Sequence, residues 1–187
     1  ELPDERKKRY VQEYSLSNYD ASILTADKSV SDYFDAVIKS DNSLKDSSKI
    51  VVNWITSELF SLLNEKNIEI YNSPITPSNL GKLVRLINND TISGKIAKEV
   101  LIEMFSNKED PESIIDRKGL KQVTDTSEIE IIVDEVIKEN QKMVEQYLSG
   151  KDKLLGFFVG QSMKKSKGKA NPKILNEILK KKLPKKN

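Results

Sequence analysis

At several places along this 187-residue chain, a residue type that caps helices is followed directly by proline, as in Thr76-Pro77, Asp110-Pro111 and Asn171-Pro172. The capping side chain accepts hydrogen bonds from amide groups that the first helical turn leaves free. Proline lacks the backbone N–H that would have no partner at the first helical position, so it fits there. Each pair therefore predicts the start of a helix. Pro3, with two acidic residues after it, predicts another start. Signals for β-strands are weak by comparison.

Between these starts, apolar residues recur every three or four positions, which is the spacing of one helical face. Trp54 lies in the strongest such stripe and is predicted to be buried. A polar, turn-like segment at 41–48 precedes this stripe. The predicted helices cover Pro3–Tyr14, Ser17–Ala26, Ser29–Lys39, Ile50–Leu63, Thr76–Asn88, Ser93–Phe105, 110–119, two helices within Glu128–Leu148 that meet near Asn140, Asp152–Lys164, and 171–184.

The segment Gly119–Thr126 has neither helical spacing nor caps and is predicted to be a connector. We therefore expect an all-α chain in two domains. Residues 1–120 would form a multi-helix bundle, and residues 121–187 a small domain of three or four helices. The second part is close to the lower size limit for independent folding.

The chain contains no cysteine and no histidine. This excludes disulfides, thiolate nucleophiles and the usual zinc ligands, and it removes the commonest general base. Carboxylates, lysines and hydroxyls remain, so an enzyme is disfavoured but not excluded. No long apolar run or signal peptide is visible, so we expect a cytoplasmic protein with no membrane partner. Because the first methionine is Met104, we also expect a piece of a longer protein.

Charge is distributed unevenly around Gly150. From there to Asn187 the sequence has twelve lysines against two acids, a net charge of +10, whereas residues 1–149 carry a net charge of −8. A basic end on an acidic body suggests a polyanionic partner. A lysine-rich end that serves only solubility explains the same charge equally well.

The lysines nearest the last predicted helix are candidates for phosphate binding. A basic loop beside free amide groups at the start of a helix is a natural phosphate site. On sequence pattern alone, a solvated loop is the simpler interpretation. Lys182, Lys185 and Lys186 extend the same basic end, and we do not rank phosphate contact against solvent for this C-terminal cluster. The candidate RNA-binding residues are Lys164, Lys165, Lys167, Gly168, Lys169, Asn171, Lys180 and Lys181.

Gly156 and Gly160 are four residues apart and fall on one helical face, where another backbone can approach closely. Each costs up to about 1 kcal/mol of helix propensity relative to alanine, which suggests a compensating contact. Packing between helices is favoured over RNA contact. The neighbouring Phe157, Phe158 and Met163 are predicted to be core residues rather than base-stacking platforms.

Two charged clusters are interpreted as ordinary solvated faces. One is the basic run Arg6–Arg9 of the first predicted helix. The other contains acids that lack a histidine or other third ligand nearby, so a metal site is disfavoured: Glu128, Glu130, Asp134 and Glu135.

One segment carries a specific resemblance. Residues 156–172, Gly-Phe-Phe-Val-Gly-Gln-Ser-Met-Lys-Lys-Ser-Lys-Gly-Lys-Ala-Asn-Pro, closely resemble the tail of the B subunit of the bacterial aspartyl-tRNA(Asn)/glutamyl-tRNA(Gln) amidotransferase. Three further places are similar to the helical domain before that tail: Glu1–Lys7, Asn53–Ile55, and 91–98. Ser162 departs from the apolar residue that is common there, which puts local packing in doubt.

The resemblance implies a helical domain and tail domain that hold the body of a tRNA, including its elbow. The implied partners are tRNA(Gln) and/or tRNA(Asn), together with the amidase (the A subunit) and the small C subunit of the heterotrimer. The implied enzyme is an ATP-dependent, glutamine-dependent carbon–nitrogen ligase. ATP and Mg²⁺ would bind the full subunit, with no cofactor and no catalytic site in this fragment. With the resemblance, RNA contact becomes the favoured role of the lysine loop.

Two functions follow as hypotheses. In the first, the chain positions misacylated Glu-tRNA(Gln) or Asp-tRNA(Asn) for amidation catalysed elsewhere in the complex. In the second, it is a helical protein–protein interaction module without RNA binding. An independent enzyme is a weaker third possibility.

Overall fold

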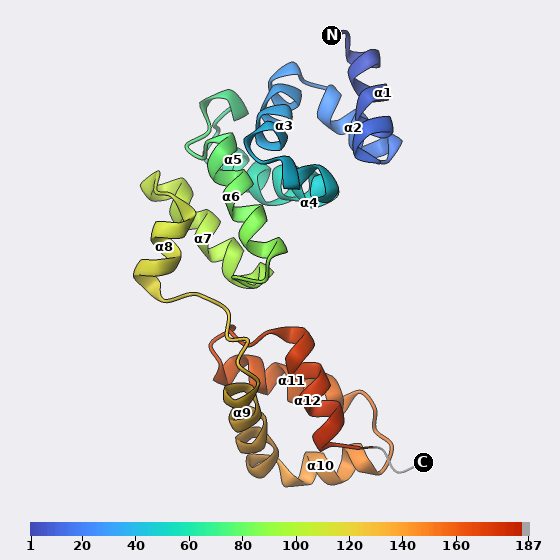
Figure 1. Cartoon of the computed structure of the whole chain (residues 1–187), viewed down its shortest axis with the longest axis vertical. Helices are drawn as coiled ribbons and strands as arrows, with labels where there is room; N and C mark the ends of the chain where they lie inside the picture. Colours follow the sequence, from blue (N-terminus) through green and yellow to red (C-terminus); the bar gives the residue numbers. More distant parts are fainter. Residues whose placement is uncertain (185–187) are drawn as a thin grey trace. The chain divides into compact units, whose positions relative to one another are not determined.

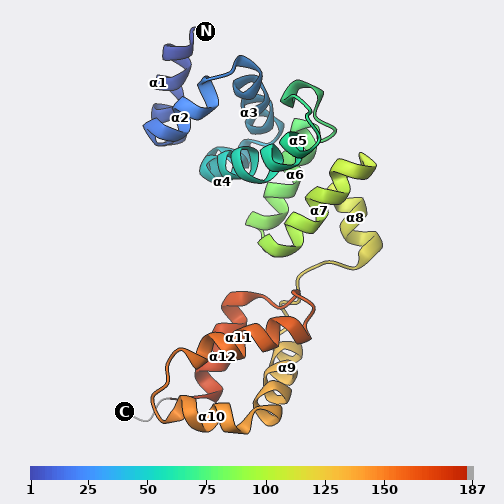
Figure 2. The ribbon, with the colours of Figure 1, turned by 180° about the vertical axis from the view of Figure 1, so that it is seen from behind.

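The computed structural model describes residues 1–184, and within this range the secondary structure is helical apart from turns and one isolated β-bridge. The expected all-α fold class is thus confirmed. The described chain forms two compact units: residues 1–89 with 97–119, and residues 90–96 with 120–184. Figures 1 and 2 show the helices of each unit from opposite sides.

The helices of the first unit begin within two residues of the predicted starts, except for the one at Phe60, which continues the preceding helix. They are α1 (Pro3–Tyr14), α2 (Asn18–Thr25), α3 (Lys28–Ser40), α4 (Ser48–Asn53), α5 (Phe60–Glu65), α6 (Pro77–Asn88), most of α7 (Gly94–Asn107) and α8 (Pro111–Lys118), with short 3₁₀ turns η1 (Asn42–Ser47) and η3 (Ile70–Asn72). Thr76 and Asp110 accept hydrogen bonds from Asn79 N and Glu112 N, as N-caps do.

A single continuous helix runs from α4 to α5 through the π-helical segment η2 (Trp54–Leu59). The sequence predicted this helix as Ile50–Leu63 without the π-helical turn. Trp54 is 8% exposed, which confirms its predicted burial. The predicted turn at 41–48 is mostly the 3₁₀ turn η1. Asp41 caps the start of this turn, because its Oδ1 accepts a hydrogen bond from Ser43 N at 2.9 Å.

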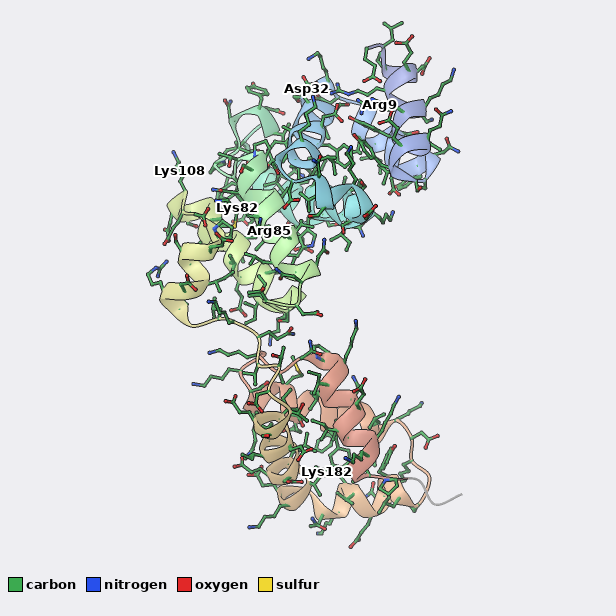
Figure 3. All side chains as sticks on the ribbon, in the orientation of Figure 1. Arg9, Asp32, Lys82, Arg85, Lys108 and Lys182 are labelled. Atoms are coloured by element: carbon green, nitrogen blue, oxygen red, sulfur yellow. The ribbon has the colours of Figure 1, made fainter. Side chains whose placement is uncertain are left out.

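The arginines of α1 are not an ordinary solvated face, so that interpretation was wrong for Arg6 and Arg9. Arg6 Nη2 lies 2.6 Å and Arg9 Nη2 lies 2.9 Å from Asp35 Oδ2 on α3. Burial alone would raise the pKa of Asp35, but hydrogen bonds from Arg9 and Arg6 outweigh it and lower that pKa. Arg6 also contacts Asp32 at 2.8 Å. The two arginines therefore attach α1 to α3, where Figure 3 labels Arg9 and Asp32.

A glycine lets α3 and α6 approach closely. A Cβ atom built on Gly81 would lie 2.4 Å from Ser40 Oγ and 3.1 Å from Leu44 Cδ1. Ser40 Oγ is itself held by a 2.7 Å hydrogen bond to the carbonyl of Val37. Glycine at 81 is therefore required by packing.

The second unit contains α9 (Thr126–Glu139), α10 (Gln141–Leu148), α11 (Leu154–Lys165) and α12 (Pro172–Lys182). The predicted bend near Asn140 separates α9 from α10. Helices α9, α11 and α12 pack on one another around a core with Phe158 at its centre, 0% exposed. Phe157 and Met163 pack against the same core, so the predicted core role of these residues is confirmed.

Candidate nucleic-acid interface

The lysine-rich segment begins where α11 ends, and its turn has a defined backbone geometry. Lys167 N donates to the Lys164 carbonyl at 3.0 Å, and Gly168 N donates to the Met163 carbonyl at 2.8 Å. This is the Schellman motif that closes many helices. Lys167 takes the left-handed position with φ 54°, and Gly168 follows with φ 78°. A left-handed residue other than glycine costs on the order of 1 kcal/mol or more, so Lys167 sits where glycine would be more stable.

Further hydrogen bonds hold this turn in place. Val123 N donates to the Lys169 carbonyl at 2.6 Å, and Asn171 N donates to the Val123 carbonyl at 2.9 Å. These bonds form the isolated parallel bridge between Val123 and Ala170. Ala170 N also donates to Ser166 Oγ at 3.2 Å. The connector between the units thus becomes part of the scaffold that presents the lysines.

Two of the predicted RNA-binding residues have structural roles. Asn171 is 5% exposed and caps α12, because its Oδ1 accepts from Lys173 N at 3.0 Å and from Ile174 N at 3.2 Å. Proline at 172 supplies no amide, so the amide groups expected to face a phosphate are not free at these positions. Gly168 is buried and serves the turn.

Lys165 and Lys182 are neutralised within the unit. Lys165 Nζ lies 2.7 Å from Glu135 Oε2 and 2.8 Å from Glu139 Oε1 on α9. Lys165 donates hydrogen bonds to Glu135 and Glu139, and these bonds, with that to Glu135 having the larger effect, raise the pKa of the Lys165 amine above its ordinary value. Lys182 Nζ, at the end of α12, lies 2.7 Å from Asp134 Oδ1 and is labelled in Figure 3.

The other predicted lysines keep their charge free. Lys164, Lys167, Lys180 and Lys181 are exposed and Lys169 is half-buried. Within residues 1–184 no carboxylate lies at ion-pairing distance from any of them. Lys164 and Lys165 are neighbours with opposite surroundings, because successive helical residues point about 100° apart. Lys185 and Lys186 lie outside the described residues.

The glycines of α11 do not pack against another helix, so the favoured packing interpretation was wrong. Both Gly156 and Gly160 are exposed, and a Cβ atom built on either would meet nothing within 4 Å in the described chain. The core of the unit lies on the opposite side, where Phe158 and Ser162 are fully buried. The helix therefore presents bare backbone to its surroundings on this face.

At Ser162, where the sequence departs from the family pattern, the structure has a buried polar group. The Ser162 hydroxyl is fully buried and has no hydrogen-bond partner within the described residues. A buried polar group without a partner costs about 1–3 kcal/mol. Nothing in the surrounding side chains explains why serine stands there.

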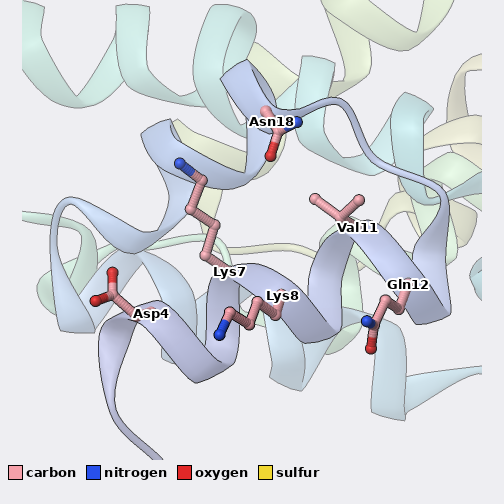
Figure 4. Close-up of a pocket in the computed structure, with 6 residues that line it drawn as sticks. All are labelled: Asp4, Lys7, Lys8, Val11, Gln12 and Asn18. Carbon is pink, nitrogen blue, oxygen red and sulfur yellow. The ribbon is translucent and has the colours of Figure 1, made fainter.

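The first unit contains a hollow that sequence reasoning missed. A space of about 380 Å³ lies beside α1 and the start of α2 (Figure 4), lined by Asp4, Lys7, Lys8, Val11, Gln12 and Asn18. Most of these side chains are exposed. It combines two lysines with a carboxylate, and no buried polar group points into it, so we assign it no ligand.

Residues 1–184 contain neither a cluster of metal-binding side chains nor a helix that could span a membrane. Among residues 1–184, no group of three or more histidine, cysteine, aspartate or glutamate side chains is arranged to hold a metal ion. In the same range, every helix is too short or too polar to cross a membrane.

Comparison with known proteins assigns the family. A family model described as "GatB domain" matches residues 32–183. The B subunit of the aspartyl/glutamyl-tRNA(Asn/Gln) amidotransferase of Rickettsia rickettsii is 53% identical over 183 residues, which is 98% of this chain and 37% of the relative. The proteins of the same name from Alkalilimnicola ehrlichii and Pelagibacter ubique are each 50% identical over 98% of this chain. The chain spans a little over a third of the length of these curated relatives. From the match over residues 32–183, we conclude that the chain belongs to the GatB domain family.

Proposed function

We propose that this chain is the tRNA-binding part of the B subunit of an aspartyl/glutamyl-tRNA(Asn/Gln) amidotransferase. The observation that carries the proposal is the set of lysines around the ends of α11 and α12 that have no carboxylate partner among residues 1–184. A structural role would be satisfied by pairing, as it is for Lys165 and Lys182. Cations left unpaired on a fixed scaffold suit phosphate oxygens, and the named relatives act on tRNA.

The proposed contact is electrostatic and depends on shape rather than on base sequence. RNA helices are recognised mainly through phosphates, riboses and geometry, since their deep groove is closed to side chains. Lys164, Lys167 and Lys169 are held on a turn whose backbone is hydrogen-bonded to Val123. The fixed turn holds the backbone of these lysines, and their flexible side chains can reach phosphates of a rigid partner such as the elbow of tRNA(Gln) or tRNA(Asn).

The role in the reaction is positioning. By holding the tRNA body, the chain would place Glu-tRNA(Gln) or Asp-tRNA(Asn) so that its aminoacylated end reaches an active site elsewhere in the complex. There the aminoacyl carboxylate is activated with ATP and amidated with ammonia from glutamine, with the amidase and the small C subunit of the heterotrimer as partners. We derive no step through ATP or Mg²⁺ from the residues of this chain.

The alternative, a helical protein–protein interaction module, makes a different prediction about which surface binds. Such a module would use apolar surface of the first unit, for example around the exposed Tyr71, and would be insensitive to the lysines of the second unit. Salt dependence separates the two hypotheses, because phosphate contacts release condensed counterions whereas apolar burial does not.

The test changes Lys164, Lys167 and Lys169 to alanine together and leaves the paired Lys165 untouched. We expect weaker binding to unmodified tRNA(Gln) or tRNA(Asn). The slope of log affinity against log salt should become shallower by about 2 to 3 units, since each phosphate contact contributes about 0.7–0.9. Fluorescence anisotropy with labelled tRNA across a salt series measures both.

A matched control removes the same charge from the first unit. Lys8, Lys39 and Lys45 are exposed and have no ion-pair partner among the described residues. Their triple alanine variant should bind tRNA with unchanged slope. Equal losses in the two triple variants would point to net charge alone, and no loss in the first would place the RNA elsewhere.

A further inference from the structure

We infer that Asp134, Glu135 and Glu139 on α9 are specificity-determining residues of the second unit, which confine bound RNA to the side of α11 and α12. The inference rests on the proposed function and deepens it. It concerns the reason why two lysines of the basic cluster are paired while the others are not.

The three carboxylates lie along α9 where that helix packs against the ends of α11 and α12. Two of them hold Lys165, with Nζ–Oε distances of 2.7 and 2.8 Å to Glu135 and Glu139. The third, Asp134, holds Lys182 at 2.7 Å. The cluster has three negative and two positive groups, so its formal charge is −1 although it contains two lysines.

These contacts are weak sources of stability. The carboxylates are 55–60% exposed as side chains, and exposed ion pairs contribute little to stability. The α9–α11–α12 interface is already formed by buried residues such as Val133, Val136 and Leu179. The ion pairs are therefore not needed to hold the helices together, and their effect on the surrounding field becomes the more important one.

The effect on a polyanion follows from charge. A phosphate that approaches Lys165 also meets Glu135 and Glu139, and like charges repel it. Glu128 and Glu130 lie on the same helix, with Lys138 as its cation. A phosphate that approaches Lys164 or Lys167 meets no such carboxylate in the described chain. The lysines at the ends of α11 and α12 thus differ: Lys164 and Lys167 are open to a phosphate, whereas Lys165 and Lys182 are neutralised by carboxylates of α9.

Neutralising part of the basic cluster supports selection by shape. Backbone contacts position a nucleic acid without reading its sequence, so a unit that is basic all round would bind many RNAs in many orientations. By neutralising Lys165 and Lys182, the carboxylates of α9 reduce the orientations in which RNA can bind and leave RNA shape to decide among them. Repulsion against wrong arrangements is a general route to specificity.

The test is a Glu135→Gln, Glu139→Gln double variant of the 187-residue chain, which frees Lys165 with little change in size. We expect about three- to tenfold tighter binding to tRNA at low salt and a slope of log affinity against log salt that is steeper by about 1 unit. Binding to an unrelated RNA hairpin of equal length should tighten at least as much, so discrimination falls. Adding Lys165→Ala should reverse both changes, whereas Lys165→Ala alone should have little effect.

Glu128→Gln, Glu130→Gln is the matched control, because it removes two charges from α9 without freeing a lysine. If this control tightens binding as much as the first pair, net charge is the cause and the inference is overturned. Unchanged binding by the Glu135 and Glu139 variant also overturns it, while the proposed function stands. A wild-type chain that does not bind tRNA overturns the proposed function and this inference together. Circular dichroism melting verifies that each variant is folded.

Discussion

The basic residues of the two units differ in whether they form ion pairs. In the first unit, Arg6 and Arg9 donate to Asp35, Lys82 to Asp110, and Arg85 to Asp41 and Glu112, so cations join one helix to another. Lys82 and Arg85 are labelled in Figure 3. In the second unit, Lys164, Lys167, Lys180 and Lys181 have no such partner within residues 1–184. Glycines inside helices also differ, since Gly81 lies against Ser40 and Leu44 whereas Gly156 and Gly160 are open.

The comparison shows that composition does not reveal the use of a residue type. Lysine and glycine occur in both units, whereas all four arginines lie in the first. Many basic residues of the first unit form internal ion pairs, but several lysines of the second unit are exposed without one within residues 1–184. A substitution should therefore change stability in the first unit and binding in the second. The predictions below test this division, beginning with the largest expected effect.

The largest effect is expected at Gly81. In a Gly81→Val variant, the new side chain meets Ser40 Oγ and Leu44 Cδ1, which lie 2.4 and 3.1 Å from the position of its Cβ. Overpacking of this kind should lower the free energy of unfolding by roughly 3 kcal/mol. Trp54, the one tryptophan of the chain, lies in this unit, so its fluorescence during guanidinium unfolding measures the effect. A normally stable variant would show that α3 and α6 are not closely packed.

The second effect concerns Asp35. Asp35→Asn removes the charge shared by Arg6 and Arg9 and should lower the free energy of unfolding by about 2 kcal/mol at neutral pH. The pKa of Asp35 is lowered in the folded chain, so its contribution is present above the unfolded pKa of about 3.9 and is lost as pH falls through the folded pKa. The difference between wild type and variant should therefore shrink on acidification. Trp54 fluorescence at several pH values measures it, and a difference independent of pH would contradict the assignment.

Sequence reasoning succeeded where a structural feature depends on residues close together in the chain. N-caps such as Thr76 and Asn171 act on amides two or three residues away, so the starts of α6 and α12 were predictable. The same holds for the bend at Asn140, where the apolar periodicity shifts. The family resemblance in residues 156–172 also came from a contiguous run of sequence.

Sequence reasoning failed where a structural feature depends on residues far away in the chain. Asp35 neutralises arginines 26 and 29 residues away, and no local pattern shows that pairing. Lys165 differs from Lys164 only through carboxylates on another helix. Two glycines four residues apart look alike whether a helix covers them or not, so only the fold could show that Gly156 and Gly160 are open. The π-helical turn at Trp54–Leu59 has no sequence signal that we identified.

A smaller effect is expected at Ser162, which lies inside the second unit and sharpens the comparison there. Ser162→Ala removes a buried hydroxyl that has no partner in the described chain, so the free energy of unfolding should rise by about 1 kcal/mol. Circular dichroism is the measurement, since Trp54 reports only the first unit. A loss of stability would reveal a hydrogen bond or bound water at that hydroxyl.

The smallest effect is expected at the glycines of α11, where the sign reverses relative to Gly81. Gly156→Ala and Gly160→Ala place a methyl group in open space, so each should raise the free energy of unfolding by up to about 1 kcal/mol through helix propensity alone. Gly81→Ala is the matched control, because the same change inside a packed helix should destabilise. Circular dichroism melting measures all three, and a destabilised Gly160→Ala chain would mean that something in the chain covers this face.

Affinity for tRNA is measured on the same variants, since a chain that is more stable but binds RNA less tightly has lost a contact that only the RNA makes. Glycine at these positions would then be explained by binding.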